Sequence, residues 1–352
     1  MWDDRFEMSE AEALEVFRHT GVLRLAVATP KGPLLRTVDG VVHDGALCFH
    51  GGDQGEKLAM LGREVMVTTD HTVAHLPSWF FDERRACPAT TYYRSVHLRG
   101  RAERVDEPAA KAAVLQALME RFQPEGGHQR IEAHDPLYAS VVDKLLVVRV
   151  RPLSIQGKAK LGQHKGARTI AKALHGLWQR GAPGDLAALR IIREAHPQRP
   201  TPPWMRGPAG TLLEVAPDER ELPGALALVE GEYWNVGVEA SRIARAHLAS
   251  SAWMVARDDL GQVVATARAM GDDAQAAWIH DVAVHPRYRG RGLGQALVGR
   301  LLDHPRVRGV RRVLLQTRDA QGFYATLGFM AHPPRHDTLA LERVPTELGR
   351  PR

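Results

Sequence analysis

The chain has 352 residues, of which 44% are hydrophobic and 25% charged, and its formal net charge is +6. This length predicts two domains, and the composition excludes a disordered or fibrous chain. The excess of positive charge favours anionic ligands such as nucleotides or phosphates, and it is also compatible with nucleic acid.

The two cysteines, Cys48 and Cys87, stand in no metal-ligand spacing. They predict a reducing, cytoplasmic setting and no disulfide scaffold. The N-terminal residues are acidic and lack an apolar segment, so no signal peptide is expected. Since no apolar run approaches the roughly 20 residues of a membrane helix, no membrane association is expected either.

The first part of the chain predicts an antiparallel β-barrel. An amphipathic helix over residues 8–20 has Ser9 as its N-cap and Gly21 at its end. Apolar, β-rich runs follow, with one short helix near 55–62, and they cover residues 22–28, 34–42, 46–50, 64–69 and 92–105. Glycine-containing segments at 31–33 and 44–45 predict hairpin turns between them. Several short strands at this spacing favour a barrel.

The next part of the chain leads from this barrel to a linker. Helices are expected over 107–122 and 135–140, before a strand that begins at Lys144. A basic segment over 155–172 then enters a helix that ends near Arg180, and another helix covers 184–195. Prolines crowd residues 197–209 and predict an irregular linker. We therefore expect an N-terminal domain over 1–196 and a C-terminal domain over 210–352.

From residue 210 the pattern changes to an α+β domain with a mixed sheet. The predicted strands cover residues 211–215, 252–257, 262–269, 277–284, 312–316 and 337–343. The predicted helices cover 221–231, 239–248, a segment that starts at Gly292, and 319–326.

A glycine-rich turn at 289–294 joins the strand over 277–284 to the following helix. Arg289, Gly292 and Gly294 fit the pattern Arg-x-x-Gly-x-Gly. Backbone N–H groups in such a turn, next to a helix N-terminus, bind anions. Because Arg287 and Arg291 add further positive charge, the turn predicts a site for a phosphate-bearing ligand.

A second motif follows at 317–329, where a short helix carries Phe323 and Tyr324 before Gly328. Together the two motifs resemble the GNAT family of acyl-CoA-dependent N-acetyltransferases, over about residues 210–345. The resemblance implies that Tyr324 protonates the departing CoA thiolate, which suits a hydroxyl whose pKa lies above that of a thiol. It implies acetyl-CoA contacts from the strand, the turn and the second motif, at Val282, Ala283, Val284, Arg289, Gly290, Arg291, Gly292, Leu293, Gly294 and Thr317. Many relatives carry Asn where Thr317 stands, so that contact is weakened or replaced.

The sequence leaves alternatives open for the general base and for the acceptor site. Asp281 and His280, expected at the start of the central strand, could deprotonate an ammonium through water, or they could be a turn residue and a surface histidine. Tyr233 and Trp234 could wall the acceptor site by cation–π contact, or they could pack as a buried pair. Acidic candidates for binding a cationic amine are Glu230, Glu232, Glu239 and Asp272, which could equally be surface charge.

Cationic and hydroxyl side chains also mark three segments of the barrel and suggest a phosphate there. The arrangement resembles the pyridoxamine-5′-phosphate-oxidase-like, FMN-binding split-barrel family over about residues 8–195. The resemblance implies FMN contacts at Arg36, Thr37, Val38, His50, Lys57, Trp79, Arg94 and Ser95. Haem or a deazaflavin are alternatives, and the full set of pyridoxamine phosphate oxidase residues is not found. Split barrels usually pair with the flavin at the subunit interface, so a homodimer is implied.

Other motifs carry less. His71 and His75 are four residues apart, but the local pattern is not clearly helical and no metal site is expected. The basic run from Lys158 to Lys172 could touch nucleic acid, but a solvated face or a wall of the flavin site is the expected role.

The sequence thus predicts an acetyl-CoA-dependent N-acetyltransferase for a small amine, fused to a flavin-binding domain of redox or sensory role. The alternative is a flavin-binding regulator, sensor or flavin reductase whose acetyltransferase half is secondary.

Overall fold

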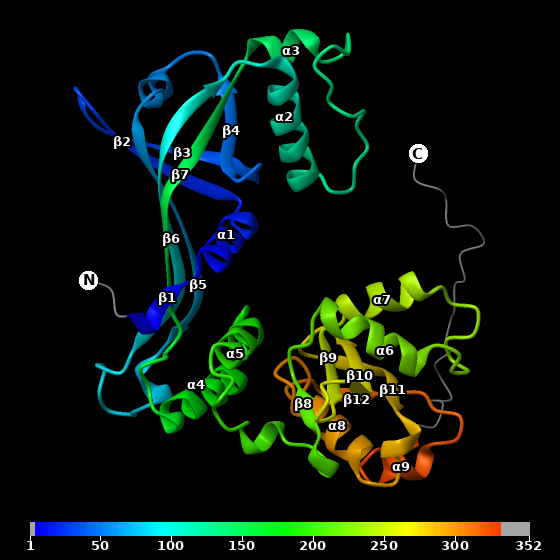
Figure 1. The fold of residues 1–352 in the computed structure, drawn as a ribbon. Helices are drawn as coiled ribbons and strands as arrows, with labels where there is room; N and C mark the ends of the chain where they lie inside the picture. Colours follow the sequence, from blue (N-terminus) through cyan, green and yellow to red (C-terminus); the bar gives the residue numbers. More distant parts are fainter. Residues whose placement is uncertain (1–3, 332–352) are drawn as a thin grey trace. The chain divides into compact units, whose positions relative to one another are not determined.

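The computed structural model describes residues 4–331, and the chain divides into two compact units, Met1–Pro202 and Pro203–Arg352 (Figure 1). The division falls inside the proline-rich segment 197–209. The prolines predicted an irregular linker, but the segment holds two 3-10 helices, η4 (Pro203–Met205) and η5 (Pro208–Gly210). Proline is tolerated in a first helical turn, where its missing N–H would have no partner.

A closed antiparallel sheet forms the N-terminal unit, in the order β1-β7-β4-β3-β2-β5-β6 with β7 also paired to β6. This confirms the predicted barrel. Asp44 and Gly45 have φ angles of 48° and 67°, as a two-residue type I′ hairpin turn requires. The strands are β1 (Glu7–Met8), β2 (Val22–Thr29), β3 (Gly32–His43), β4 (Ala46–Gly52), β5 (Glu64–Leu76), β6 (Thr90–Val105) and β7 (Leu145–Lys160).

Helices cover this barrel and extend it. In α1 (Glu10–His19), Ser9 and Glu12 form a reciprocal capping box, and Ala13, Val16 and Phe17 are buried against the sheet. The other helices are α2 (Pro108–Phe122), α3 (Ala139–Lys144), α4 (Ala167–Arg180) and α5 (Asp185–Glu194), with the 3-10 helices η1 (Asp4–Phe6), η2 (Glu56–Met60) and η3 (Ser78–Phe80).

Two predicted boundaries in this unit were wrong. The helix expected over 135–140 begins only at Ala139, because Asp135 accepts a hydrogen bond from the Leu137 N–H and holds a turn there. The basic segment that begins at residue 155 is strand as far as Lys160, because β6 pairs with it through the register Leu98↔Ile155 to Tyr93↔Lys160.

The C-terminal unit is a five-stranded mixed sheet in the order β12-β11-β10-β9-β8, in which β11 and β12 run parallel. This confirms the predicted α+β class. Helices α6 and α7 lie on one face and α8 on the other (Figure 1). The strands are β8 (Leu212–Glu214), β9 (Ala252–Arg257), β10 (Val263–Gly271), β11 (Ala276–Val284) and β12 (Arg312–Leu314). The helices are α6 (Leu222–Val229), α7 (Ala240–Leu248), α8 (Leu293–Leu302) and α9 (Gln321–Ala325), with η6 (Glu219–Glu221) and η7 (Pro286–Tyr288). The strand expected over 337–343 lies outside the described residues.

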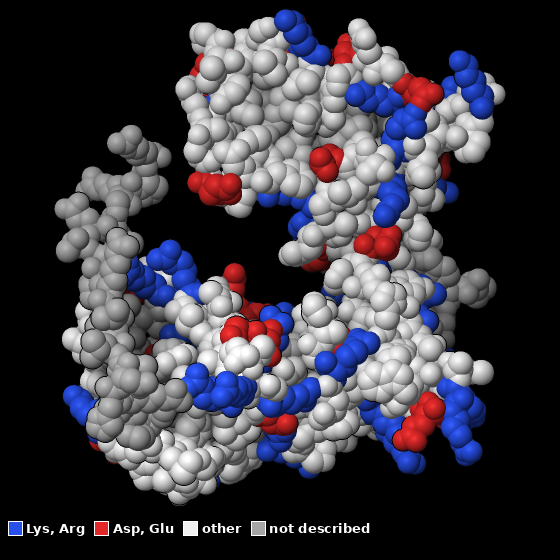
Figure 2. All heavy atoms as spheres, turned by 180° about the vertical axis from the view of Figure 1, so that it is seen from behind, with Lys and Arg blue, Asp and Glu red and all other residues white. Residues whose placement is uncertain are grey.

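Within residues 4–331, every helix is too short or too polar to cross a lipid bilayer. On the face shown in Figure 2, Lys and Arg side chains are interspersed with Asp and Glu, so the net positive charge is not gathered into a single field on that face.

Candidate active site and flavin site

The parallel pair β11–β12 opens a cavity in the C-terminal unit. Strand β12 pairs with β11 only from Ala276↔Arg312 to Trp278↔Leu314. Beyond Trp278 the two strands separate, and among residues 4–331 no strand pairs with this edge of β11 from residue 279 to 284. A cavity of about 1180 Å³ lies along this edge. An unpaired strand edge offers backbone N–H and C=O groups that a ligand can bind as a further strand would.

The glycine-rich turn closes one end of this cavity. Gly290 and Gly292 have φ angles of 71° and 78°, which residues with a Cβ adopt at a cost. Helix α8 follows with Gly292 as its N-cap, and no side chain caps its first N–H groups. The Arg289 Nε donates to the Val284 carbonyl at 2.9 Å, which holds the turn against the end of β11. The first turn of α8 is therefore available to an anion.

The second motif lies on the other wall. Tyr324 of α9 lines the cavity, and its ring contacts those of Phe323 and Phe329 edge to face at 4.9 and 5.7 Å. Burial and the neighbouring Tyr233 raise the pKa of Tyr324, so the hydroxyl stays protonated at neutral pH. Of the thirteen predicted catalytic and acetyl-CoA residues, all but Arg291 line this one cavity, namely Tyr324, Asp281, His280, Val282, Ala283, Val284, Arg289, Gly290, Gly292, Leu293, Gly294 and Thr317.

Asp281 and His280 were expected to begin the central strand. They lie instead within β11, at a bulge. The register with β10 shifts between Thr266↔Ala283 and Arg268↔His280, and Asp281 has a φ of 51°. The bulge turns the Asp281 side chain inward, where it is 6% exposed. His280, the residue before it, faces the cavity.

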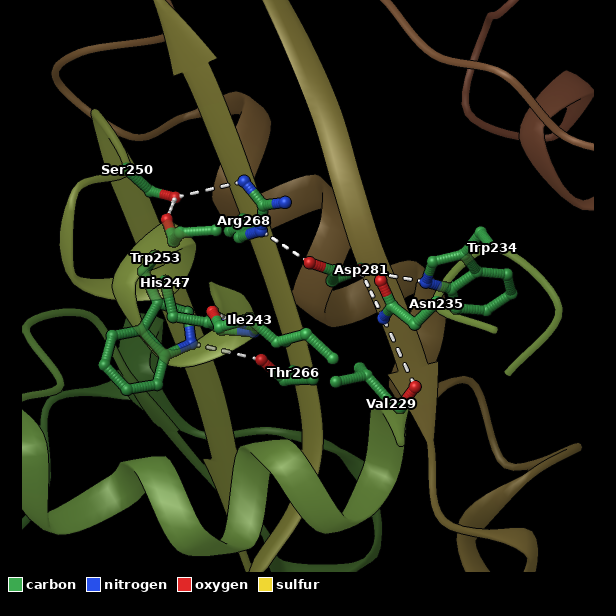
Figure 3. A network of polar contacts seen from close by, with 11 residues as sticks. Val229, Trp234, Asn235, Ile243, His247, Ser250, Trp253, Thr266, Arg268 and Asp281 are labelled. Atoms are coloured by element: carbon green, nitrogen blue, oxygen red, sulfur yellow. Dashed lines mark hydrogen bonds and ion pairs between the residues drawn. The ribbon is translucent and has the colours of Figure 1, made fainter. Parts of the chain in front are cut away.

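Asp281 is the centre of a buried polar network (Figure 3). Its carboxylate accepts from Arg268 Nε at 2.6 Å, Trp234 Nε1 at 2.8 Å and Asn235 Nδ2 at 3.2 Å. Burial opposes ionisation of this carboxyl, but the Arg268 guanidinium, His247 and the hydrogen bonds hold its pKa below its usual range. Asp281 is thus a fixed anion that ties the α6–α7 loop, residues 230–239, to the strand.

The loop tied in this way supplies residues that the sequence left open. Glu232, Tyr233 and Trp234 line the cavity, whereas the other acidic candidates, Glu230, Glu239 and Asp272, are not among its lining residues. The Asp272 carboxylate accepts from backbone N–H groups of its own turn. Sequence reasoning missed Arg268, Asn235 and Trp278. A signal existed for Arg268, since a lone charge within an apolar strand is seldom buried without a partner.

In the N-terminal unit, three of the predicted FMN residues gather where β4 meets η2. Arg36 forms an ion pair with Glu56, and the Lys57 ammonium lies against the backbone of Gly51, next to His50. Burial and the Lys57 charge lower the pKa of His50. Lys57 has no hydrogen-bond or ion-pair partner among residues 4–331. Because η2 is a five-residue 3-10 helix, its N-terminus contributes little here, and the side-chain cations are what fit a phosphate.

The other predicted FMN residues lie elsewhere on the barrel. Arg94 and Ser95 are on β6, which is three strands from β3 in the sheet order β3-β2-β5-β6. Thr37 points to the opposite face of β3 from its neighbours Arg36 and Val38, because successive side chains of a strand alternate. Trp79 is on η3 with 56% of its surface exposed, packed on Phe80 at 4.6 Å. All eight FMN contacts, including those at β4 and η2, remain predictions.

Comparison with known families agrees with this division. Residues 9–159 match the family described as pyridoxamine 5′-phosphate oxidase, and residues 218–329 match the acetyltransferase (GNAT) family. Each of the two units of the chain thus matches one of these families. We refer to residues 1–202 as the oxidase-like unit and to residues 203–352 as the GNAT unit.

Relatives of known name match the GNAT unit. GCN5-related N-acetyltransferase 1 of Arabidopsis thaliana is 41% identical over 71 residues, which are 20% of this chain and 36% of the relative. Serotonin N-acetyltransferase 2 of Oryza sativa subsp. japonica is 40% identical over 79 residues, 22% of this chain and 40% of the relative. Glucosamine 6-phosphate N-acetyltransferase 1 of the same plant is 45% identical over 53 residues, which are 15% of this chain and 32% of the relative. The chain thus spans well under half the length of these relatives.

Solved structures match each unit. A structure from Xanthomonas campestris pv. campestris assigned to the GNAT family is 32% identical, with 38% of this chain and 94% of that chain covered and a TM-score of 0.33. The flavocytochrome Anf3 of Azotobacter vinelandii is 18% identical, with 44% and 69% covered and a TM-score of 0.38.

The glycine turn of the GNAT unit gives the first testable prediction. Gly292→Ala places a Cβ on a residue with a φ of 78°, which costs about 1–2 kcal/mol or tilts the first turn of α8. We expect the acetyl-CoA Kd to rise about tenfold, measured by calorimetry. Gly299→Ala in the same helix is the matched control, since its Cβ would meet no atom within 4 Å. A Gly292→Ala variant that binds like the wild type contradicts the assignment of the turn.

Proposed function

We propose that the GNAT unit transfers the acetyl group of acetyl-CoA to the nitrogen of a small amine. The observation that carries the proposal is one cavity that combines the free edge of β11, the uncapped start of α8 and the Tyr324 hydroxyl. These would hold the pantetheine arm, the pyrophosphate and the departing sulfur in turn. Positioning of this kind supplies much of the rate enhancement of a bimolecular transfer.

In the proposed reaction the amine nitrogen attacks the thioester carbon. The new C–N bond forms, the C–S bond breaks, and the electron pair leaves on sulfur. The Tyr324 hydroxyl then donates its proton to the thiolate, and its raised pKa keeps that proton in place until then.

His280 is the group best suited to take the proton of the amine, directly or through water. Asp281 is fully engaged by Arg268, Trp234 and Asn235, whereas His280 faces the cavity. Partial burial and the Arg268 charge lower the pKa of His280, against the opposing effect of Asp281, so the ring is neutral at pH 7. A neutral imidazole can accept a proton.

The experiment that tests this function is release of free CoA thiol from acetyl-CoA in the presence of a panel of amines. Amine-dependent release supports the proposal, and absence of acetyl-CoA binding contradicts it. Followed against pH, kcat/KM falls as the pH drops below the His280 pKa, which lies under the ordinary 6.5. A profile that stays flat into the acid range contradicts the role of His280.

We also propose that the oxidase-like unit binds FMN, with the phosphate held by Arg36 and Lys57 beside His50. The cluster at β4 and η2 fits a phosphate because Lys57 has no other anion to pair with in the described part of the chain. Bound FMN would supply redox chemistry. The chain's own contribution at this corner is electrostatic, since the cations would fix the phosphate and thereby the position of the ring.

The visible spectrum of the purified protein tests the flavin. We expect an absorption band near about 450 nm, which is general flavin chemistry, and Lys57→Ala should lower the flavin content several-fold through loss of a charged contact. Lys31→Ala, in the exposed β2–β3 turn, is the control. A Soret band would replace FMN with haem, and a colourless protein would contradict both.

A homodimer through the barrel is part of this proposal. Leu35, Ala26 and Met66 are aligned across three strands by the register Leu35↔Ala26↔Met66, and Leu35 and Met66 are 57% and 38% exposed. An apolar row of this kind on a sheet face favours burial against a second copy. The molecular mass in solution tests it.

A further inference from the structure

We propose that the acceptor of the GNAT unit is a cationic amine carried on an aromatic body, recognised by Trp278, Tyr233 and Trp234 with Glu232. The inference rests on the acetyl-transfer function proposed above and deepens it. Similarity does not select this acceptor, because relatives of comparable identity are named for serotonin and for glucosamine 6-phosphate. The side chains that line the far end of the cavity favour it instead.

The direction of β11 separates the two ends of the cavity. The anion-binding turn, 289–294, follows the C-terminal end of the strand at Val284, so the nucleotide part of acetyl-CoA belongs there. The thioester then lies near the bulge at Asp281. Trp278 and His280 precede the bulge, and the α6–α7 loop is tied to it by Trp234 and Asn235. The acceptor therefore enters among Trp278, His280 and this loop.

Aromatic side chains dominate that end and are half exposed. Trp278, Tyr233 and Trp234 have 39%, 38% and 38% of their surfaces exposed, although all three line the cavity. The Tyr233 and Trp234 rings meet edge to face at 4.8 Å. Three large rings that remain open to one cavity leave apolar surface that a flat apolar ligand would cover, at roughly 25 cal/mol for each Å² removed from water.

These rings are held in place. The Trp234 Nε1 donates to buried Asp281 at 2.8 Å, and the Tyr233 hydroxyl accepts from the Arg318 N–H at 3.1 Å. The Arg318 guanidinium also lies over the Tyr233 ring, 3.8 Å from its centroid. Both polar tips are satisfied within the protein, so what remains for a ligand is the exposed ring surface, which in Tyr233 is the part that Arg318 does not cover. A surface fixed before binding costs little ordering entropy.

The charge at this end favours a cation. The Arg268 and Asp281 charges cancel in their ion pair, and His280 is neutral at pH 7. The remaining charged residues of this wall are Glu232, Asp319 and Arg318, which sum to one negative charge. The Glu232 carboxylate has no side-chain partner within residues 4–331. An ammonium next to the aromatic faces is stabilised by both the carboxylate and cation–π contact, whereas a phosphate-bearing acceptor is repelled.

The test compares acceptors that differ in one feature, with the full-length protein. We expect kcat/KM for tryptamine and phenethylamine to be at least tenfold higher than kcat/KM for butylamine. The difference from glucosamine 6-phosphate should be larger still. In Trp278→Ala, the preference for tryptamine over butylamine should collapse at least tenfold, while the acetyl-CoA Kd stays unchanged. Leu260→Ala, in an exposed turn where the side chain is 79% exposed, is the control for both readouts.

The outcomes separate the two proposals. Butylamine or glucosamine 6-phosphate acetylated as well as tryptamine would overturn the aromatic acceptor but leave acetyl transfer standing. An equal fall in kcat/KM for all amines in Trp278→Ala would also overturn it. Calorimetric titration of tryptamine into the complex with CoA, which cannot react, gives a readout without turnover, and absence of binding there also overturns it. Failure to bind acetyl-CoA would instead remove the acetyl-transfer function itself.

Discussion

Tyr324→Phe is expected to lower kcat for acetyl transfer by about 10²–10⁴-fold, the usual contribution of a general acid. The change removes one hydroxyl and keeps the ring that packs against Phe323 and Phe329. Without the hydroxyl, the CoA thiolate must leave unprotonated or take its proton from water. The measurement is thiol release at saturating acetyl-CoA and amine, with the acetyl-CoA Kd determined separately.

The separation of kcat from binding is what identifies the role. Because the hydroxyl acts on sulfur only as the C–S bond breaks, the Kd of acetyl-CoA should change less than twofold. Tyr138→Phe removes a hydroxyl that donates to the Gln129 carbonyl in the oxidase-like unit, and it should leave kcat unaltered. Full activity in Tyr324→Phe would exclude the residue as the acid and leave it as part of the aromatic wall.

Local sequence patterns predicted which residues line the part of the cavity that we propose for acetyl-CoA, for a physical reason. The proposed anion site is built from consecutive residues, so the glycines at 290 and 292, the strand before them and the helix after them are adjacent in the chain. The φ angles of 71° and 78° at these positions are what glycine provides. Tyr324 could be predicted to line the same cavity because its helix follows the turn at a typical distance in the sequence and ends at Gly328.

The side of the cavity that we propose for the acceptor was not predictable in the same way. Arg268, Asp281 and Trp234 come from β10, β11 and the α6–α7 loop, and only the bulge brings them together. A bulge depends on pairing between strands, which the pattern of one strand does not reveal. The same holds for the barrel, where strands were predicted but the strand order that places Arg94 of β6 three strands from Arg36 of β3 was not. Sequence patterns placed the strands, and pairing decided which side chains meet.

Asp281→Asn is expected to destabilise the GNAT unit by about 3–5 kcal/mol, the usual cost of leaving one member of a buried ion pair alone. Arg268 is 9% exposed and would keep its charge without the carboxylate that lies 2.6 Å from its Nε. Scanning calorimetry of the full chain can measure the loss, since acetyl-CoA should raise the transition of the GNAT unit and thereby identify it. Asp259→Asn, in an exposed turn, should change that transition by less than about 0.5 kcal/mol.

The pH dependence has a definite sign. The pKa of Asp281 is lower in the folded protein than in the unfolded chain, where a carboxyl has a pKa of about 4. Its contribution to stability is therefore complete above the unfolded pKa and is lost as the pH falls through the folded pKa. Asp281→Asn should lack this acid-sensitive part of the unfolding free energy. An unchanged acid limb in the variant would contradict the assignment.

Comparison of two substitutions separates charge from backbone at the bulge. Asn tolerates the left-handed φ of 51° at position 281, whereas Ala there adds about 1–2 kcal/mol of strain, so Asp281→Ala should be the less stable of the two. The loss of stability in Asp281→Asn is expected to come from the unpaired Arg268 charge. Arg268→Met combined with Asp281→Asn should then recover much of that stability, because replacing both members of a buried ion pair by uncharged side chains often changes stability little. The double variant should nevertheless bind tryptamine more weakly than the wild type, since the Trp234 indole would lose the charged acceptor that fixes the α6–α7 loop. Recovered stability with impaired acceptor binding would show that Asp281 positions the acceptor wall in addition to stabilising the fold.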